Sequence, residues 1–183
     1  MSLVTYLTPD EQEAVRAQYR AGNAIMEEAV RARKPGGFYA NRISAASRYA
    51  AEELIKCERF LGEICDASHT DNGIVEAFYQ NGNACVQPGL DFLTYERGCT
   101  HVVTEPRPDL GEVYARKALT LITGKVALLL PVYWMTTPDA KKLFDETPLA
   151  RVYILSKKLR YRGAMAWFVF EMGHFEGPTI RWI

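Results

Sequence analysis

The stretch HVVTEPRPDLGEVYARKALTLITGKVALLL, residues 101–130, indicates the fold class. Its first four and last six residues have the largely apolar composition of buried strands. Apolar side chains recur at helical spacing over 109–123, with the acids Asp109 and Glu112 at the expected start and Gly124 after the expected end. Because strand, helix and strand follow one another, the two strands are expected to run parallel, with the helix on one face of their sheet.

The same alternation continues along the chain. Further strands are expected at 61–65, 83–86, 151–155, 164–170 and 179–183, and further helices at 44–57, 74–80 and 139–144. The expected fold class is therefore α/β, a mostly parallel sheet with helices on both faces and late antiparallel strands. Ligands of such sheets bind at the carboxyl ends of the strands, so the loops after Cys65 and Thr104 are the first candidates for a site.

A long helix is expected ahead of this domain. The start at 8–11, Thr-Pro-Asp-Glu, combines a hydroxyl cap, a proline at the first helical position and two acids. Lys-Pro-Gly-Gly at 34–37 ends it. We therefore divide the chain into an N-terminal helical extension, residues 1–37, and a domain, residues 38–183. The helix either packs on the domain or forms the contact surface for a protein partner.

Composition narrows the function classes. The 183 residues carry 22 Lys and Arg against 22 Asp and Glu, so a local basic patch remains possible but no strong overall attraction to nucleic acid is expected. No apolar run approaches the ~18 residues of a membrane span, and early acids such as Asp10 are unlike a secretory signal. We expect a cytoplasmic protein without membrane partners. The four cysteines form no CxxC pair, and no metal site is expected.

The C-terminal half resembles one protein family. KVALLLP at 125–131, LFDETP at 143–148 and RVYILSK at 151–157 are similar to consecutive elements of the phage and prophage SAM-dependent adenine-specific DNA methyltransferases. AWFVFE at 166–171 resembles a strand near the end of that family. The resemblance covers 38–183 and implies a Rossmann-like methyltransferase fold, SAM as cofactor, DNA as substrate and a phage or prophage gene in a bacterial host.

The family resemblance assigns the cofactor to the loop after the first strand and to the tip of the second strand. Family members place an acid, two glycines and an Ile-Val helix start in that loop. Asp66 and Asp71 match its acidic positions, and Gly73 lies one position from an expected glycine. Gln87 stands where the family has an acid that binds the ribose hydroxyls. The resemblance thus makes these four residues the candidate SAM contacts.

The same resemblance places catalysis at Thr104-Glu105-Pro106-Arg107-Pro108. The family has Asn-Pro-Pro followed by Tyr or Phe, in which the Asn and a proline carbonyl accept hydrogen bonds from the target amine. The aromatic ring of that motif stacks on the flipped base. Glu105, Pro106 and Arg107 are therefore the candidate catalytic residues, and Pro108 takes the place of the aromatic ring.

Departures from the family pattern define the functional hypotheses. Thr70 and Asn72 occupy the two glycine positions, where a side chain crowds the cofactor. The leading hypothesis is a divergent homologue with impaired catalysis and weak SAM binding, which acts by binding nucleic acid or a protein partner. The alternatives are an active SAM-dependent DNA adenine methyltransferase, an altered chemistry at the same loops, and a structural or regulatory interaction module.

The densest basic stretch in the chain lies at 157–162. It comprises Lys157, Lys158, Leu159, Arg160, Tyr161 and Arg162. Cations neutralise a phosphate backbone and an interleaved tyrosine stacks on a base. We predict DNA contacts for its four cations and its tyrosine, and the alternative is a solvated hairpin connection.

Two neighbouring aromatic residues, Tyr133 and Trp134, follow the expected strand at 125–130. They lie at the edge of the sheet where ligands bind. They either line a pocket or pack in the core.

Overall fold

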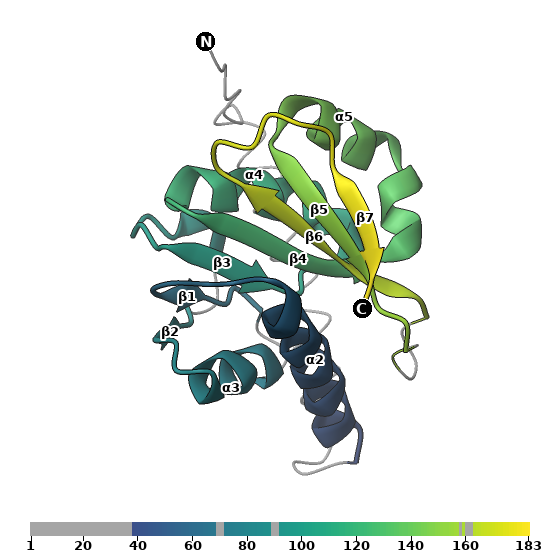
Figure 1. Ribbon diagram of the computed structural model, residues 1–183. Helices are drawn as coiled ribbons and strands as arrows, with labels where there is room; N and C mark the ends of the chain where they lie inside the picture. Colours follow the sequence, from purple (N-terminus) through teal and green to yellow (C-terminus); the bar gives the residue numbers. More distant parts are fainter. Residues whose placement is uncertain (1–37, 69–71, 89–91, 158, 160–162) are drawn as a thin grey trace.

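The computed structural model describes residues 38–68, 72–88, 92–157, 159 and 163–183, with side chains from Ala45 onward. These residues form one seven-stranded sheet with helices on both faces (Figure 1). The α/β class and the mostly parallel sheet are therefore confirmed. The helix expected at 8–34 lies outside the described residues.

The helices and strands follow the expected order. The helices are α2 (Phe38–Cys57), α3 (Gly73–Gln80), α4 (Gly111–Leu121) and α5 (Pro138–Glu146), with short 3-10 helices at Phe92–Thr94, Pro108–Leu110 and Val132–Thr136. The strands are β1 (Ile64–Cys65), β2 (Cys85–Val86), β3 (His101–Thr104), β4 (Lys125–Pro131), β5 (Leu149–Ile154), β6 (Met165–Glu171) and β7 (Thr179–Trp182). Each element expected between residues 44 and 183 is present, and the largest difference is at α2, which begins six residues earlier than the expected Ser44.

The strand order is β2-β1-β3-β4-β6-β5-β7. Of these seven strands in the described part of the chain, β6 alone runs antiparallel to its neighbours, and β7 runs parallel to β5. In the parallel ladder Cys65 lies level with Val102, and Thr104 with Leu128. The carboxyl ends of β1 to β5 therefore share one edge of the sheet, which we call the carboxyl edge, and their starts share the opposite, amino edge.

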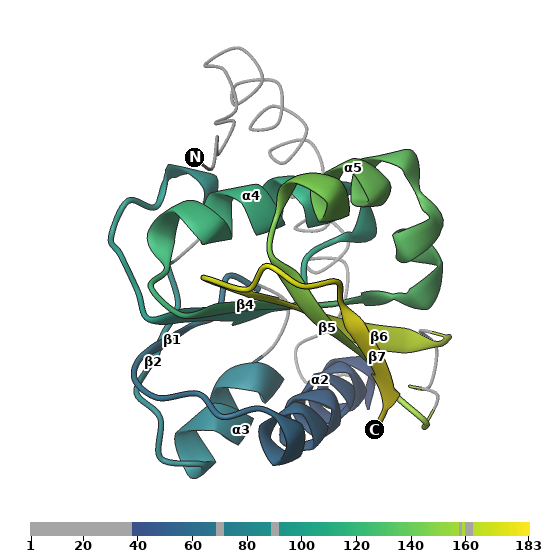
Figure 2. The same cartoon turned by 45° about the horizontal axis from the view of Figure 1, so that its top comes forward.

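Two helical layers cover the sheet. Helices α4 and α5 lie on one face, and α2 and α3 on the other (Figure 2). Side chains of β4 alternate between the two cores: Val126, Leu128 and Leu130 pack under α4 and α5, and Ala127 and Leu129 face α2 and α3. A strand buried on both faces has an uninterrupted apolar sequence, which explains KVALLLP. No helix among the described residues has the length and apolar character to cross a bilayer.

The start of α4 differs from the expected cap. Asp109 and Glu112 do not cap it; the chain first makes a 3-10 turn, α4 begins at Gly111, and its N-cap position is Leu110. The structural reason for Gly111 is close packing, since an added Cβ would lie 2.9 Å from the ring of Trp134. The first residue of α4 is therefore packed against Trp134, and no side-chain cap among the described residues precedes it.

The end of α4 also differs from expectation, because Gly124 does not supply it. The helix ends at Leu121, and Ile122 is already extended. Gly124 is instead required by its neighbours: an added Cβ would lie 2.5 Å from the ring of His101 and 2.9 Å from the carbonyl oxygen of Thr100. This glycine permits β3 and β4 to begin side by side.

Candidate functional site

Loops leaving β1, β2, β3 and β4 gather at the carboxyl edge. The first loop begins with Asp66, which is fully buried. One carboxylate oxygen of Asp66 accepts a hydrogen bond from the Ser68 amide at 2.8 Å, and the other accepts from the Ser68 hydroxyl at 2.8 Å. An aspartate that binds the backbone two residues on is a common way to close a turn. Asp66 therefore fixes the direction in which the chain leaves β1.

The amino end of α3 follows this loop. Gly73 is the first helical residue and is buried. The preceding Asn72 does not cap the helix with its side chain among the described residues; its amide oxygen lies 3.4 Å from Nε2 of Gln87, at the tip of β2. Asp66, Gly73 and Gln87 thus lie on neighbouring elements of one edge, as the resemblance implied, whereas Asp71 lies outside the described residues, together with Thr70.

The loop after β3 is held by contacts within the protein. Glu105 accepts a hydrogen bond from the hydroxyl of Ser47 at 2.9 Å, and Pro106 is buried. Arg107 makes a bidentate ion pair with Asp109, with N–O distances of 3.1 and 2.6 Å. Both charged residues at the positions of the expected catalytic motif therefore have partners in the same chain, and the three candidate catalytic residues lie together at the tip of β3.

Ser47 was not among the predicted site residues, although a signal for it exists. It lies on the apolar stripe of α2 that includes Ala51 and Leu54, and it is 1% exposed. A buried hydroxyl on such a stripe requires a hydrogen-bond partner. Here the partner is Glu105, which lies 58 residues further along the chain, and sequence spacing alone does not reveal a contact of that range.

Tyr133 and Trp134, at the tip of β4, have different environments. Trp134 is 3% exposed and packs edge-to-face on Phe144 and Phe168, with ring centroids 5.6 and 5.0 Å apart. Tyr133 is 63% exposed. The core alternative therefore holds for Trp134, whereas Tyr133 is exposed at the carboxyl edge.

The basic stretch begins at the same edge, just after β5. Lys157 is exposed, and its Nζ lies 4.9 Å from the ring centroid of Tyr49 on α2, a cation–π distance. The other four residues predicted to contact DNA, Lys158, Arg160, Tyr161 and Arg162, lie outside the described residues. The structure thus places one member of the predicted patch at the carboxyl edge.

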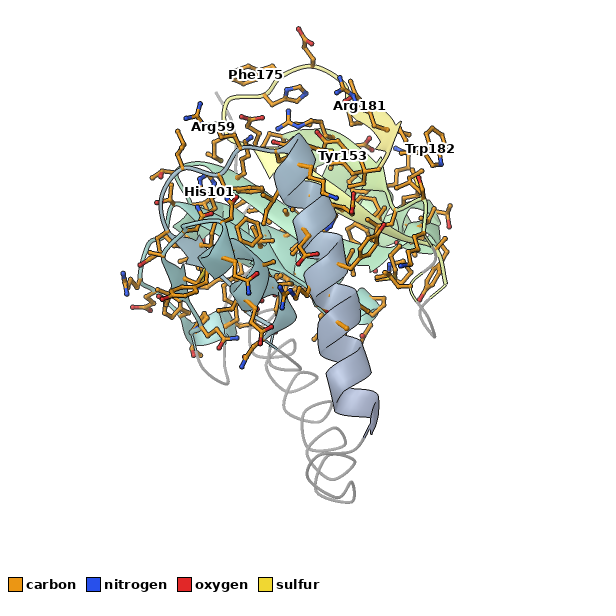
Figure 3. The ribbon with its side chains drawn as sticks, turned by 60° about the horizontal axis from the view of Figure 1, so that its bottom comes forward. Arg59, His101, Tyr153, Phe175, Arg181 and Trp182 are labelled. Atoms are coloured by element: carbon orange, nitrogen blue, oxygen red, sulfur yellow. The ribbon has the colours of Figure 1, made fainter. Side chains whose placement is uncertain are left out.

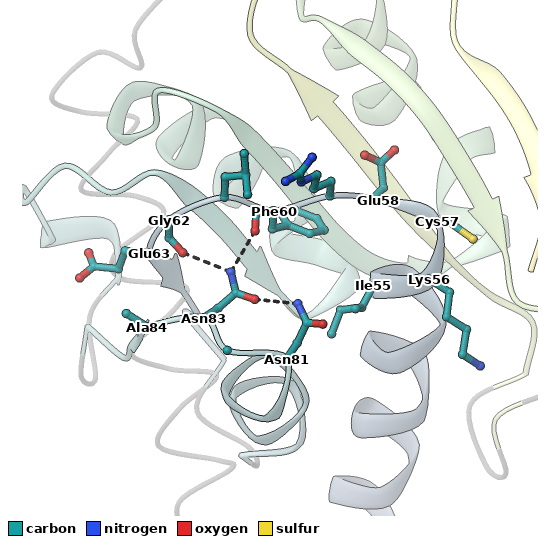
Figure 4. Close-up of a pocket in the computed structure, with 13 residues that line it drawn as sticks. Ile55, Lys56, Cys57, Glu58, Phe60, Gly62, Glu63, Asn81, Asn83 and Ala84 are labelled. Carbon is teal, nitrogen blue, oxygen red and sulfur yellow. Dashed lines mark hydrogen bonds between the residues drawn. The ribbon is translucent and has the colours of Figure 1, made fainter.

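An open pocket of about 690 Å³ lies at the opposite, amino edge (Figure 4). Residues 55–63 and 81–84 line it. Its Asn83 amide donates to the carbonyl oxygens of Phe60 and Gly62 at 3.0 and 3.3 Å, and Asn81 donates to Asn83 at 3.0 Å. These amides hold the pocket wall together, so their hydrogen bonds serve the fold.

The amino edge also holds a buried carboxylate. Glu58, just past the end of α2, accepts hydrogen bonds from Lys125 at 2.5 Å, from the Tyr153 hydroxyl at 2.8 Å and from Arg151. Burial alone raises the pKa of Glu58, but the hydrogen bonds from Lys125, Tyr153 and Arg151 outweigh burial and lower it. Burial and the bond to Glu58 raise the pKa of Tyr153 to about 12. Tyr153 lies near the end of α2, with His101 to one side of it (Figure 3).

Comparison with known proteins identifies the fold class. No family model and no curated protein matches the chain. A structure described as a predicted O-methyltransferase from Agrobacterium tumefaciens superposes with a TM-score of 0.51 and 9% identity, over 74% of this chain and 85% of that chain. The protein therefore has a methyltransferase-type α/β fold.

Two structures of magnesium protoporphyrin IX methyltransferase from Synechocystis PCC 6803 are also similar. The one with bound SAM has a TM-score of 0.49 and 10% identity, over 91% of this chain and 99% of that chain. The one with bound SAH has a TM-score of 0.47 and 9% identity, over 87% and 98%.

Proposed function

We propose that this protein binds nucleic acid at the carboxyl edge of its sheet and has lost most of the methyl-transfer activity of the DNA adenine methyltransferases it resembles. The observation that supports this most directly is the state of the loop after β3. Glu105 is held by Ser47, and Arg107 is paired with Asp109. A target amine needs an acceptor aimed at it in a site that excludes water. Glu105 is hydrogen-bonded to Ser47 of α2 and lies beside the Arg107–Asp109 ion pair, so its carboxylate is poorly suited to accept from a target amine.

The candidate cofactor residues at the ends of β1 and β2 support the same proposal. Both oxygens of Asp66 already accept hydrogen bonds from Ser68, and the side chain of Gln87 reaches Asn72. A nucleoside cofactor such as SAM would have to compete with these contacts for its ribose and amino-acid partners. The described residues therefore fit SAM poorly, and we propose that SAM binds weakly.

Nucleic-acid binding is proposed to depend on the stretch that begins at Lys157. This lysine lies at the carboxyl edge and rests on Tyr49 of α2, which brings a cation and an aromatic ring together. Lys158, Arg160, Tyr161 and Arg162 complete the proposed surface. Contacts of this kind bind phosphates without reading sequence, and their strength falls steeply with salt.

Calorimetric titration with SAM tests the catalytic part of the proposal. We expect no binding in the micromolar range and no methyl transfer to adenine in DNA. A variant that combines Thr70→Gly, Asn72→Gly, Glu105→Asn and Pro108→Tyr restores the family pattern and should bind SAM more tightly than the natural protein. Micromolar SAM binding by the natural protein would contradict the proposal.

Measurement of DNA binding at several salt concentrations tests the nucleic-acid part. Neutralisation of Lys157, Lys158, Arg160 and Arg162 to glutamine should weaken binding and reduce the dependence of affinity on salt. Neutralisation of Lys141 and Lys142, which lie on α5, is a control that removes two charges and should leave binding unchanged. An equal loss of affinity per charge removed in both sets would mean that only the overall charge matters.

An active SAM-dependent DNA adenine methyltransferase is the second candidate. The start of α3 favours it, because Gly73, the first residue of the helix that follows β1, is buried. Backbone amides at such a helix start suit a negatively charged cofactor group. The SAM titration separates the two candidates.

A further inference from the structure

We propose that Tyr133 is the aromatic platform of this site and that a nucleobase, exposed from a single strand or flipped out of a duplex, stacks on its ring. The inference rests on the proposed nucleic-acid function and names the group that receives the base. Pro108 stands where the resembled family has its stacking ring, so the loop after β3 has no aromatic side chain between Glu105 and Asp109. Tyr133 lies beside that loop and supplies one.

The sheet places Tyr133 next to the loop after β3. Strand β4 is the parallel neighbour of β3, and Thr104 lies level with Leu128, so both chains leave the sheet at the same edge. Trp134 then packs against the first turn of α4, where an added Cβ on Gly111 would lie 2.9 Å from its ring. Because Gly111 directly follows the loop at 105–110, this contact holds the turn that carries Tyr133 at the end of that loop.

The backbone of Tyr133 is held while its ring stays exposed. Its carbonyl oxygen accepts a hydrogen bond from the Thr136 hydroxyl at 2.7 Å, and the amide of Thr137 donates to the carbonyl of Trp134 at 3.0 Å. Trp134 itself packs against Phe144 and Phe168 in the core. A 63% exposed ring on so fixed a backbone binds a flat partner with little loss of conformational freedom.

The end of β3 carries a buried polar group on the same side of the sheet. The hydroxyl of Thr104, at the tip of β3, is fully buried and has no hydrogen-bond partner among the described residues. Thr104 is level with Leu128, and Leu128 shares one core with Trp134, so the hydroxyl lies on the same face of the sheet as the turn that carries Tyr133. Buried hydroxyls are normally satisfied, so this one is hydrogen-bonding capacity that the described residues leave unused at the end of β3.

The test uses a dye-labelled single-stranded oligonucleotide of thymines with one 2-aminopurine, whose emission falls when it stacks on an aromatic ring. We expect the natural protein to quench the 2-aminopurine, and Tyr133→Ala to lose the quenching and about 5- to 100-fold in affinity. Tyr133→Phe should retain both properties, and Tyr133→Leu should lose the quenching although it keeps an apolar side chain. The salt dependence of binding should stay unchanged in all three variants, because phosphate contacts set it.

Tyr79→Ala is the matched control. Tyr79 is 73% exposed near the end of α3, away from the carboxyl edge, so its removal should alter neither affinity nor quenching. Equal quenching by Tyr133→Ala and the natural protein overturns the assignment and leaves nucleic-acid binding standing. Failure of the natural protein to bind the oligonucleotide at low salt overturns the proposed function, and the assignment with it.

Discussion

The two edges of the sheet use their charged residues differently. At the amino edge, Glu58 joins the end of α2 to β4 and β5, through Lys125 and Arg151. At the carboxyl edge, Asp66 binds a residue two positions away, and Arg107 likewise binds Asp109. Long-range pairs tie distant elements into one fold, whereas short-range pairs shape a single loop. The amino edge therefore maintains the fold, and the carboxyl edge has loops that can change with function.

The largest expected loss of stability comes from removing the charge of Glu58 at the amino edge. Glu58→Gln removes the charge that faces Lys125 and Arg151, and Glu171 remains as an acidic partner of both cations. Loss of one acid from a network that keeps a second one costs up to about 3 kcal/mol. Chemical denaturation measures the free energy of unfolding.

Arg97→Ala is the control for Glu58→Gln. Arg97 makes an ion pair with Glu63 at 2.9 Å, but its side chain is 61% exposed. Such surface pairs contribute at most about 1 kcal/mol. If Glu58→Gln is no worse than Arg97→Ala, the amino edge does not hold the fold together as described.

The dependence of stability on pH tests the role of Glu58 at the amino edge. The pKa of Glu58 lies below its ordinary value of 4.5, so its contribution to stability is complete above that pH and is lost as the pH falls through the lowered value. The natural protein should therefore lose stability in acid more steeply than Glu58→Gln. Thermal unfolding midpoints of both proteins, measured side by side, give the difference. Parallel curves would show that Glu58 does not titrate in this way.

A smaller effect is expected from the hydrogen bond between Ser47 and Glu105 at the carboxyl edge. Ser47→Ala removes one donor to Glu105, whose carboxylate is partly exposed. The expected loss is about 1 kcal/mol in the free energy of unfolding. Ser47→Thr, which keeps the hydroxyl, serves as the control and should recover part of the loss. A loss of stability as large as that of Glu58→Gln would mean that the two edges contribute equally to the fold.

The smallest effect belongs to Arg107→Ala. Arg107 pairs with a residue two positions away, and both side chains are partly exposed. Removal should change the free energy of unfolding by less than about 0.5 kcal/mol. Denaturation curves that overlay those of the natural protein are the expected result, and a clear shift would mean that this loop supports the fold.

The sequence predicted the sheet well because its signals are local. The apolar run of β4 and the helical spacing of α4 each lie within a dozen or so residues. Packing between distant segments was not predictable in this way. Gly111, at the start of α4, packs against Trp134, and Gly124 makes room for His101 where a helix end was expected.

The candidate site likewise has a part that could be predicted from the sequence and a part that could not. Asp66, Gly73 and Gln87 were predicted from a resemblance to a family. The structure places them on neighbouring elements, and their role as SAM contacts stays a prediction. The contact from Ser47 to Glu105 joins residues 58 positions apart, so it appears only once the chain is folded.

The lengths of the strands have a consequence for local unfolding. The ladder between β1 and β2 contains two residue pairs, whereas the ladder between β4 and β6 contains seven. Amide protons in the short ladder should exchange with deuterated solvent long before those in the long one, because fewer bonds must open together. The half of the sheet that carries Asp66 and Gln87 is therefore the half that opens first, and a ligand bound there would be seen most clearly as slowed exchange in β1 and β2.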